Sequence, residues 1–576
     1  MGLLPCAPMF ITKPECRWIV PVIALCVSSC VEGDSGPSDA GRHGLQTTAE
    51  ILVTSESGDR LARKSNVQFS TGQADGTVIE IFPERRKQTL VGIGTSFTES
   101  SAFVLAHLEP AARTEVMHRI YGEDGANFSL ARTTIGSTDF SVEGKFSYAP
   151  VADDAELQHF SIAVDRDGFS QSQYPGVKDE SFDLLPMIKE AQAIKSAQQD
   201  KDLRIVSSAW TAPPWMKDIE DWYYRPVGEI GMEGTGGVLK DEYVQTYADY
   251  LVKYLDAYAA AGVDIWGMTP VNEPHGNSGS WESMHCTPET QNEFIKAHLG
   301  PALHAGGHED VKVLIYDQNR NDLEHWTDVI LADPETAPYV YGTAVHWYAS
   351  TYKVYEDTLE RVRAKFPDFE IINTEATIDN LGVPAPGGIT DPEGYTESGW
   401  YGNDAFWWNE TATDWAYSAT WAPNVEDHPV YTPVHRYARN IIVSLDHGMA
   451  GWIDWNVVLD RQGGPNHVGN FCGAPIMIDT DTGEVYYTPI YAVLAQLSRT
   501  IRPGDVAVQT ERRLAGLGDD ALHASAAINE DGLLSVQLLN TTKEPISLGL
   551  QIGDEFAAIE MPANAVQTVR VQIPQD

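Results

Sequence analysis

The chain alternates short apolar runs with longer stretches of helical periodicity, and this alternation restricts its fold more than any other feature of the sequence. Parallel strands need helical crossovers, so repeated strand and helix units indicate a parallel sheet covered by helices. Eight such units predict an α/β fold, a closed (β/α)8 TIM barrel. The apolar runs end near Thr98, Asp139, Trp210, Glu273, Asp317, Tyr348, Glu375 and Asn456, and the helical patterns cover residues 100–121, 182–198, 239–261, 288–304, 323–331, 355–366, 434–445 and 489–501.

Short alternating runs flank the barrel region and predict a side β-domain with an antiparallel sheet. Residues 50–53 and 76–81 precede the barrel, and further runs follow Gly504 up to residue 573. A free carbohydrate-binding module is the alternative for the C-terminal part. The predicted division is a signal peptide at 1–29, a tether at 30–48, N-terminal strands of the side β-domain at 49–90, the barrel at 91–502 and a C-terminal β-domain at 503–576.

The start of the chain has the pattern of an export signal. Lys13 and Arg17 precede the apolar run Trp18–Leu25, and Val27–Cys30 resembles a bacterial lipobox in which Cys30 is acylated. The Gly-, Ser- and Asp-rich residues that follow are typical of a tether. We therefore expect an exported protein, lipid-anchored at Cys30 in a bacterial envelope on the periplasmic side or the cell surface. Plain secretion after cleavage is the alternative.

The cysteine count excludes a disulfide framework. Four of the six cysteines lie in the leader, which leaves Cys286 and Cys472 in the folded part. These two either pair with each other or remain separate buried thiols.

The net charge of −43 restricts the partners of the protein. A strongly acidic surface repels phosphate backbones and anionic lipid headgroups. The charge therefore argues against nucleic acid and favours a neutral substrate.

Two apolar runs end in a glutamate, and this pair carries the main prediction of function. Glu273 closes the run that starts at Ile265, and Glu375 closes the run that starts at Phe369. The carboxyl ends of the strands in a barrel meet at one mouth, so we expect the two carboxylates to face each other across a sugar ring.

Other polar and aromatic residues follow most of the predicted strands. A lone Asp after a strand is commonly a helix cap, and a lone Trp is commonly part of the core. Together, however, flat aromatic faces with carboxylates and amides are what binds a neutral sugar. The residues are Asp139, Trp210, Asn272, His346, Trp347, Tyr348, Trp452, Asp454, Trp455 and Asn456.

Two motifs suggest other chemistry and are set aside. Gly92 and Gly94 lack the third glycine of a phosphate loop, and a tight backbone turn is preferred. The segment Asp479–Gly483 lacks the later Glu of a calcium loop, and a turn between extended segments is preferred. No zinc spacing of His and Cys is present, so we expect no metal and no cofactor.

The order and identity of these motifs resemble glycoside hydrolase family 30, the glucosylceramidase-like enzymes with a clan A barrel. The resemblance implies a retaining mechanism with Glu273 as acid/base and Glu375 as nucleophile. It also implies that Asp139, Trp210, Asn272, His346, Tyr348, Trp455 and Asn470 hold the sugar, and that the β-domain packs beside the barrel. The motifs are Val91–Glu99, Ser137–Ser141, Ala209–Lys217, Val271–Pro274, His346–Tyr348, Thr374–Ala376 and Trp455–Asn466; Asn470 rests on the alignment of residues 466–471.

The resemblance leads to a specific expectation of activity. We expect a retaining β-glycosidase that acts on glucosylceramide-like β-glucosides or β-1,6-glucan, with a raised pKa at the acid/base Glu273. Retention requires carboxylates roughly 5 to 5.5 Å apart, against about 6.5 to 9.5 Å for inversion. The alternatives are a relative that acts on xylan or xylosides, a non-catalytic glycan-binding lipoprotein, and an acyl hydrolase. The acyl hydrolase is the weakest because no Gly-x-Ser-x-Gly elbow is present.

Overall fold

The computed structural model of the chain describes residues 48–224, 234–277, 279–378, 401–409 and 432–574. The predicted signal peptide, Cys30 and the tether up to residue 47 lie outside these residues. Within them, no helix combines the length and the apolar composition needed to cross a membrane.

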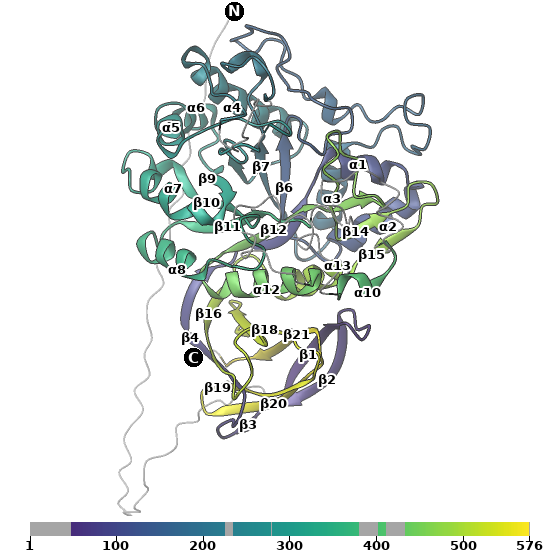
Figure 1. The fold of residues 1–576 in the computed structure, drawn as a ribbon, viewed down its shortest axis with the longest axis vertical. Coiled ribbons are helices and arrows are strands. Elements are labelled where there is room, and N and C mark those ends of the chain that lie inside the picture. Colours follow the sequence, from purple (N-terminus) through teal and green to yellow (C-terminus); the bar gives the residue numbers. More distant parts are fainter. Residues whose placement is uncertain (1–47, 225–233, 278, 379–400, 410–431, 575–576) are drawn as a thin grey trace, which may run out of the picture. The chain divides into compact units, whose positions relative to one another are not determined.

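A closed barrel of parallel strands forms the larger part of the molecule and confirms the predicted fold (Figure 1). The strands follow one another around the barrel in chain order, and the last pairs with the first. They are β5 (Gly92–Ser96), β6 (Leu130–Ile135), β7 (Arg204–Ala209), β8 (Gly267–Thr269), β9 (Lys312–Asn319), β10 (Val340–His346), β11 (Glu370–Glu375) and β12 (Gly451–Asn456).

Helices follow the barrel strands in the predicted regions, but two of the predicted helices are interrupted. The pattern at 100–121 forms two helices because Pro110 begins the second one and disfavours helical backbone just before it. The pattern at 288–304 contains a π-helical stretch, η4 (Ile295–Leu299), just before Pro301, which has no N–H to donate. The helices are α1 (Glu99–Ala106), α2 (Pro110–Tyr121), α3 (Leu184–Ser196), α4 (Val244–Ala260), α5 (Pro288–Phe294), α6 (Gly300–Gly306), α7 (Leu323–Ile330), α8 (Glu356–Lys365), α12 (Pro433–Asp446) and α13 (Pro489–Thr500).

The strand that leads to Glu273 is shorter than the sequence predicts. The apolar run suggests a strand over 265–272, whereas β8 covers only Gly267–Thr269. Pro270 follows directly and has no N–H for the ladder, so regular pairing ends there. The backbone then turns sharply, and Glu273 has a left-handed φ of 48°.

The two glycines at the start of the barrel lie in strand β5, so the predicted turn at this position is wrong. A Cβ on Gly94 would lie 1.6 Å from the carbonyl oxygen of Leu130 in the neighbouring strand. The glycine therefore serves the close approach of two barrel strands. The turn predicted at Asp479–Gly483 does lie between two paired strands, β14 (Ile476–Ile478) and β15 (Val485–Tyr487).

A second sheet combines strands from both ends of the described chain, as the sequence predicts. Its order is β2-β1-β21-β18-β17-β16-β4-β19-β20-β3, and β4 pairs with β19 in parallel. The sequence did not predict β2, β3 and β16. The strands are β1 (Thr48–Ser55), β2 (Ala62–Gln68), β3 (Ser70–Thr71), β4 (Val78–Thr89), β16 (Val506–Arg513), β17 (Leu522–Ile528), β18 (Leu533–Asn540), β19 (Ile546–Ile552), β20 (Glu555–Met561) and β21 (Ala565–Gln572).

The second sheet packs on helices of the barrel, which excludes a free module. Helices α12 and α13 lie between the barrel strands and this sheet (Figure 1). Gln496 of α13 accepts a hydrogen bond from Thr54 of β1 at 2.7 Å. Its amide also donates to the carbonyl of Val566 in β21 at 3.2 Å. Gln496 thus connects the barrel to the first strand of the second sheet in the chain, β1, and to the last one, β21.

Candidate active site

The interior of the barrel has an apolar floor and a polar layer above it. The floor is a small buried cluster that includes Leu130, Val206 and Ile372. Side chains two residues further along a strand point to the same side, so the next layer contains Arg132 and Thr374. The polar layer is therefore placed at the carboxyl ends of the strands, where the predicted carboxylates lie.

Glu375, the last residue of β11, is held in its charged form by two donors. It is 7% exposed. The Arg132 guanidinium forms an ion pair with its Oε2, and the Tyr348 hydroxyl donates to its Oε1 at 3.0 Å. Burial raises the pKa of Glu375 above its ordinary value, but the charges of His346 and Arg132 oppose this effect. The geometry thus presents a positioned carboxylate to the mouth of the barrel.

Glu273 lies opposite, on the turn after β8. Its backbone N–H donates to the carbonyl of Asp317 at 3.0 Å, which holds the left-handed turn in place. Its Oε1 lies 3.1 Å from His346 Nδ1. Non-glycine residues in this backbone region are uncommon and gather at functional sites.

The separation of the two carboxylates is that of a retaining enzyme. One oxygen of Glu273, one oxygen of Glu375 and a ring nitrogen of His346 all lie within 4.8 Å of one another. Inverting enzymes keep their carboxylates about 6.5 to 9.5 Å apart to admit a water molecule, whereas retaining ones need only about 5 Å.

His346 is a cation among three acidic side chains. Its Nε2 lies 2.9 Å from Asp317 and its Nδ1 faces Glu273. Burial lowers its pKa, but Glu375, Asp317 and Glu273 outweigh this effect and raise the pKa to about 9. A protonated imidazole uses both nitrogens as donors. The cluster of Glu273, His346 and Glu375 is therefore arranged for proton and hydrogen-bond chemistry.

Asp317 supports this cluster from inside β9. It is fully buried and accepts hydrogen bonds from Arg132 at 2.8 Å and from Thr269 and Thr374 at 2.6 Å each. Burial works against its charge, but Arg132 and His346 hold the pKa of Asp317 well below its usual range. A permanently charged Asp317 fixes the orientation of both cations.

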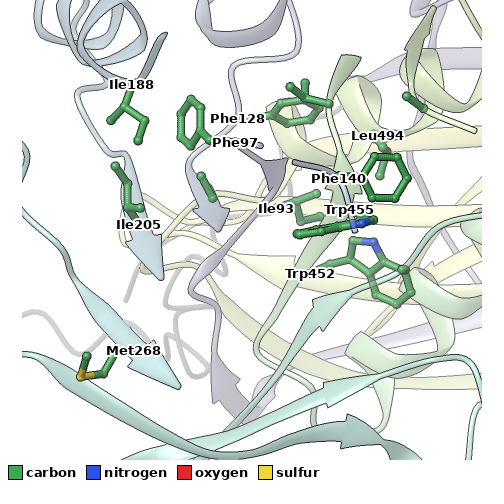
Figure 2. Packing of buried hydrophobic residues seen from close by; sticks show 14 of the residues in the cluster. Ile93, Phe97, Phe128, Phe140, Ile188, Ile205, Met268, Trp452, Trp455 and Leu494 are labelled. Carbon is green, nitrogen blue, oxygen red and sulfur yellow. The ribbon is translucent and has the colours of Figure 1, made fainter. Parts of the chain in front are cut away.

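An aromatic and polar wall lies on the other side of Arg132. The rings of Trp210 and Trp455 stack at 5.1 Å, and the Arg132 guanidinium lies 4.8 Å from the Trp210 ring centre. Phe140 meets the Trp455 ring edge-on at 6.1 Å, and Figure 2 shows both among the buried residues of the core. Asn272 accepts from Arg132 at 2.6 Å, which leaves its amide NH2 as a donor for a ligand.

Asp139 and Asn470 meet at the same wall. The amide of Asn470 donates to the Asp139 carboxylate at 2.9 Å, and Asn466 donates to the same oxygen at 3.3 Å. Burial raises the pKa of Asp139 to about 7, opposed by the hydrogen bond from Asn470. The structure therefore brings all nine predicted site residues to one mouth of the barrel, where Arg132 contacts Glu375, Asn272, Trp210 and Trp455.

Several residues that follow strands belong to the core instead. Trp347 and Trp452 are at most 1% exposed and meet edge to face at 5.8 Å. Asp454 is also buried, and burial raises its pKa well above the ordinary value. For the two tryptophans, the ordinary interpretation of a lone Trp as part of the core is correct.

Sequence reasoning missed Arg132 and Asp317. Both lie inside strands rather than after them, and Asp317 was used only to mark the end of a run. The available signal was a charged residue within an apolar run, since Arg and Asp are almost never fully buried unless paired.

Comparisons with known proteins agree with this geometry. Residues 90–382 and 416–501 match the family model described as "Glycosyl hydrolase family 30 TIM-barrel domain". Residues 506–569 match "Glycosyl hydrolase family 30 beta sandwich domain".

Individual relatives cover most of the chain. The lysosomal acid glucosylceramidase of Mus musculus is 28% identical over 88% of this chain and 87% of its own length. An endo-1,6-beta-D-glucanase of Neurospora crassa is 25% identical over 79% of this chain and 78% of its own length. The crystal structure of SrfJ from Salmonella typhimurium superposes with a TM-score of 0.71 at 22% identity, covering 92% of this chain and all of that one. The chain is a glycoside hydrolase and belongs to glycosyl hydrolase family 30.

Proposed function

We propose that this enzyme hydrolyses β-glucosidic bonds with retention of configuration, with Glu375 as nucleophile and Glu273 as acid/base. The observation that carries the proposal is the close approach of their carboxylates, with oxygens within 4.8 Å. Names of relatives support glucose as the sugar, since they include a glucosylceramidase and an endo-1,6-beta-D-glucanase.

The first step forms a covalent glycosyl-enzyme. A Glu375 oxygen attacks the anomeric carbon, and the bond from that carbon to the leaving oxygen breaks. Glu273 gives its proton to the leaving oxygen, so the aglycone departs as an alcohol. Arg132 and Tyr348 hold Glu375 on line for the attack.

The second step releases the sugar. Glu273, now a carboxylate, takes a proton from water while the water oxygen attacks the anomeric carbon. The ester bond to Glu375 breaks, and both residues return to their starting forms. His346 donates to Glu273 and stabilises its charged form in this step.

The wall residues hold the sugar in this proposal. Asp139 and Asn470 accept from and donate to sugar hydroxyls, and the stacked pair of Trp210 and Trp455 offers an apolar face. Asn272 donates its free amide group to the hydroxyl next to the anomeric carbon, where hydrogen bonds strengthen in the transition state. His346 and Tyr348 orient the two carboxylates.

A substrate screen with product analysis tests the function. Purified enzyme is assayed on glucosylceramide, β-1,6-glucan, xylan and aryl β-glycosides, and the first sugar released is followed by proton NMR. We expect cleavage of β-glucosides with the β-anomer appearing first. An α-anomer as first product contradicts retention, and cleavage of xylan or aryl β-xylosides alone contradicts glucose as the sugar.

We also propose that the protein is exported and anchored by a lipid on Cys30. The support is the charged, apolar and lipobox order of residues 13–30. Mass spectrometry of the N-terminal peptide from the native envelope tests this. An acylated Cys30 at the new N-terminus is expected, and a free N-terminus at any other residue contradicts the anchor.

A further inference from the structure

A second charged group lies behind the sugar-binding wall, and the proposed chemistry does not use it. Glu282 lies in the loop between β8 and α5, and its side chain is completely buried. The Ser137 hydroxyl donates to its Oε1 at 2.8 Å, and His467 Nε2 lies 3.4 Å from its Oε2. Ser137 comes from the loop after β6 and His467 from the loop after β12. Three loops of the barrel mouth therefore meet at one buried carboxylate.

Glu282 lies in the loop that directly follows Glu273. The loop begins at Pro274 and closes at Cys286, whose N–H donates to the Pro274 carbonyl at 3.0 Å. Lys217, from the loop after β7, donates to the Ser283 carbonyl at 2.9 Å. These two hydrogen bonds hold Cys286 next to Pro274, the residue after Glu273, and Ser283, the residue after Glu282.

His467 connects Glu282 to Asp139. Its backbone N–H donates to the Asp139 carbonyl at 3.1 Å, and its Nδ1 lies 3.2 Å from the Ser141 carbonyl. The Asp139 carboxylate is held by Asn470, three residues beyond His467. The imidazole therefore stands between the loop of Glu273 and the loop of Asp139.

A buried carboxylate is stable only when a partner neutralises it. His467 lies 3.4 Å from Glu282, and the charge of Glu282 also acts on Lys217. Burial disfavours charge on both groups, but each outweighs this effect for the other, so the pKa of His467 is raised and that of Glu282 is lowered. The charged groups that face His467 are Glu282 and Asp139. Both favour its protonated form.

We propose that Glu282 and His467, here called the rim pair, are positioning residues that lock the loop of Glu273 to the loops of Asp139 and Asn470 and thereby set the affinity for the sugar. The rim pair does not touch the reacting atoms. Its effect passes through the position of Asp139, so the inference rests on the proposed role of Asp139 in sugar binding.

The rim pair predicts a loss that appears in KM rather than in kcat. His467→Gln and Glu282→Gln each keep a polar side chain and remove one charge. We expect either variant to raise KM for the best aryl β-glycoside about tenfold at about pH 6, with kcat changed less than about threefold. The double variant should raise KM no further than Glu282→Gln alone, because the interaction is already lost.

The pH dependence distinguishes an effect of the charge on His467 from an effect of its packing. As the pH rises through the titration of His467, the wild type loses the same cation that His467→Gln lacks. The ratio of the two KM values should therefore fall toward one as the pH rises above the ordinary pKa of an imidazole, because the pKa of His467 is raised. His467→Lys keeps a cation in place of the imidazole and should restore most of the affinity, so its KM should stay low at the pH where that of the wild type rises.

A matched control comes from a surface pair of the same kind. His308 Nε2 lies 2.9 Å from Asp256 on the outer helices, so His308→Gln removes an imidazole from a carboxylate far from the barrel mouth. Its KM should equal that of the wild type at every pH. Thermal unfolding confirms that each variant is folded before its kinetics are read.

The outcomes distinguish the inference from the proposed function. A wild type that cleaves none of the β-glucosides in the substrate screen overturns the proposed function before any variant is made. A wild type that is active, with KM unchanged in His467→Gln and Glu282→Gln, overturns only the rim pair. If KM is raised in His467→Gln but its ratio to the wild-type KM does not vary with pH, the rim pair is also overturned. The same holds if His467→Lys does not restore a low KM. In both cases the effect is one of packing.

Discussion

At the scale of single residues, Arg132 is the side chain on which the active site most depends. Its guanidinium reaches Glu375, Asp317 and Asn272, which come from three different strands or strand ends. Removing one partner of a buried ion pair leaves an uncompensated charge, and here two carboxylates lose their partner.

Arg132→Met should therefore destabilise the protein as well as inactivate it. We expect the free energy of unfolding to fall by about 3 to 5 kcal/mol, measured by urea denaturation. The control is Arg361→Met, since the pair of Arg361 with Glu324 is exposed to solvent and contributes little. Equal stability of the two variants would show that Arg132 is not the partner of buried charges.

The two glutamates should respond differently to truncation. Glu375→Ala removes the nucleophile and should lower kcat about 10⁴-fold or more on every substrate. Glu273→Ala should lower kcat strongly for alkyl glycosides but much less for aryl glycosides with acidic leaving groups, which need no proton. Glu370→Ala, at the other end of β11, is the control and should retain activity. Comparable loss on both substrate classes in Glu273→Ala contradicts the acid/base role.

The charge of His346 should make part of the stability pH-dependent. Its pKa is 6.5 when unperturbed and about 9 in the folded protein, so the folded state binds the proton more tightly. The resulting stabilisation is fully present below about pH 6.5 and is lost as the pH rises through about 9. The free energy of unfolding of the wild type minus that of His346→Asn should shrink across this interval. A constant difference would mean that His346 is not protonated in the fold.

Residues at strand ends could be predicted from the sequence, but residues inside strands could not. Glu273 and Glu375 end apolar runs, so strand geometry alone places them at one mouth. In the sequence, Arg132 and Asp317 only interrupt apolar runs. The three-dimensional structure is needed to show which side chains neutralise their charges. The rim pair joins two loops, and no local pattern states that such loops meet.

At the scale of elements, close contact between β5 and β6 depends on a missing side chain. Gly94→Ala would place a Cβ 1.6 Å from the Leu130 carbonyl, which is backbone and cannot rotate away. We expect the variant to be insoluble or to melt far below the wild type. Gly518→Ala is the control, because a Cβ there meets nothing within 4 Å. A melting temperature of Gly94→Ala equal to the wild type would contradict the close strand packing.

Element boundaries followed local chemistry where that chemistry is strong. The break before α2 comes from Pro110, which is visible in the sequence. By contrast, β2 has an almost entirely exposed pattern, and its strand conformation comes from pairing with β1. Periodicity predicts elements that bury one face, and it is silent on edge strands such as β2.

At the scale of the whole molecule, the second sheet needs both ends of the described chain. A chain that begins at Leu90 lacks β1 to β4 and leaves open edges on β16, β19 and β21. Unpaired edges promote aggregation, so we expect this truncation to be insoluble. A chain that begins at Leu45 keeps these strands and should be soluble and active, as size-exclusion chromatography and an aryl glycoside assay will show. A monodisperse, active product from the shorter chain would contradict the prediction.

The class of architecture could be predicted because eight strand and helix units repeat along the chain. The pairing order of the second sheet could not, because β1 pairs with β21, β4 with β16 and β19, and β3 with β20, which are all hundreds of residues away. The pattern of a short alternating strand does not indicate which distant strand it pairs with.

The pairing of β1 with β21 has a consequence for folding during synthesis. Thr48–Ser55 leave the ribosome long before their partner Ala565–Gln572. At roughly 5 to 20 residues per second, the early strand waits on the order of half a minute or longer. During that interval β1 lacks its partner strand β21. A chaperone, or passage through a translocation channel in the unfolded state, is needed to prevent aggregation of the apolar face of β1.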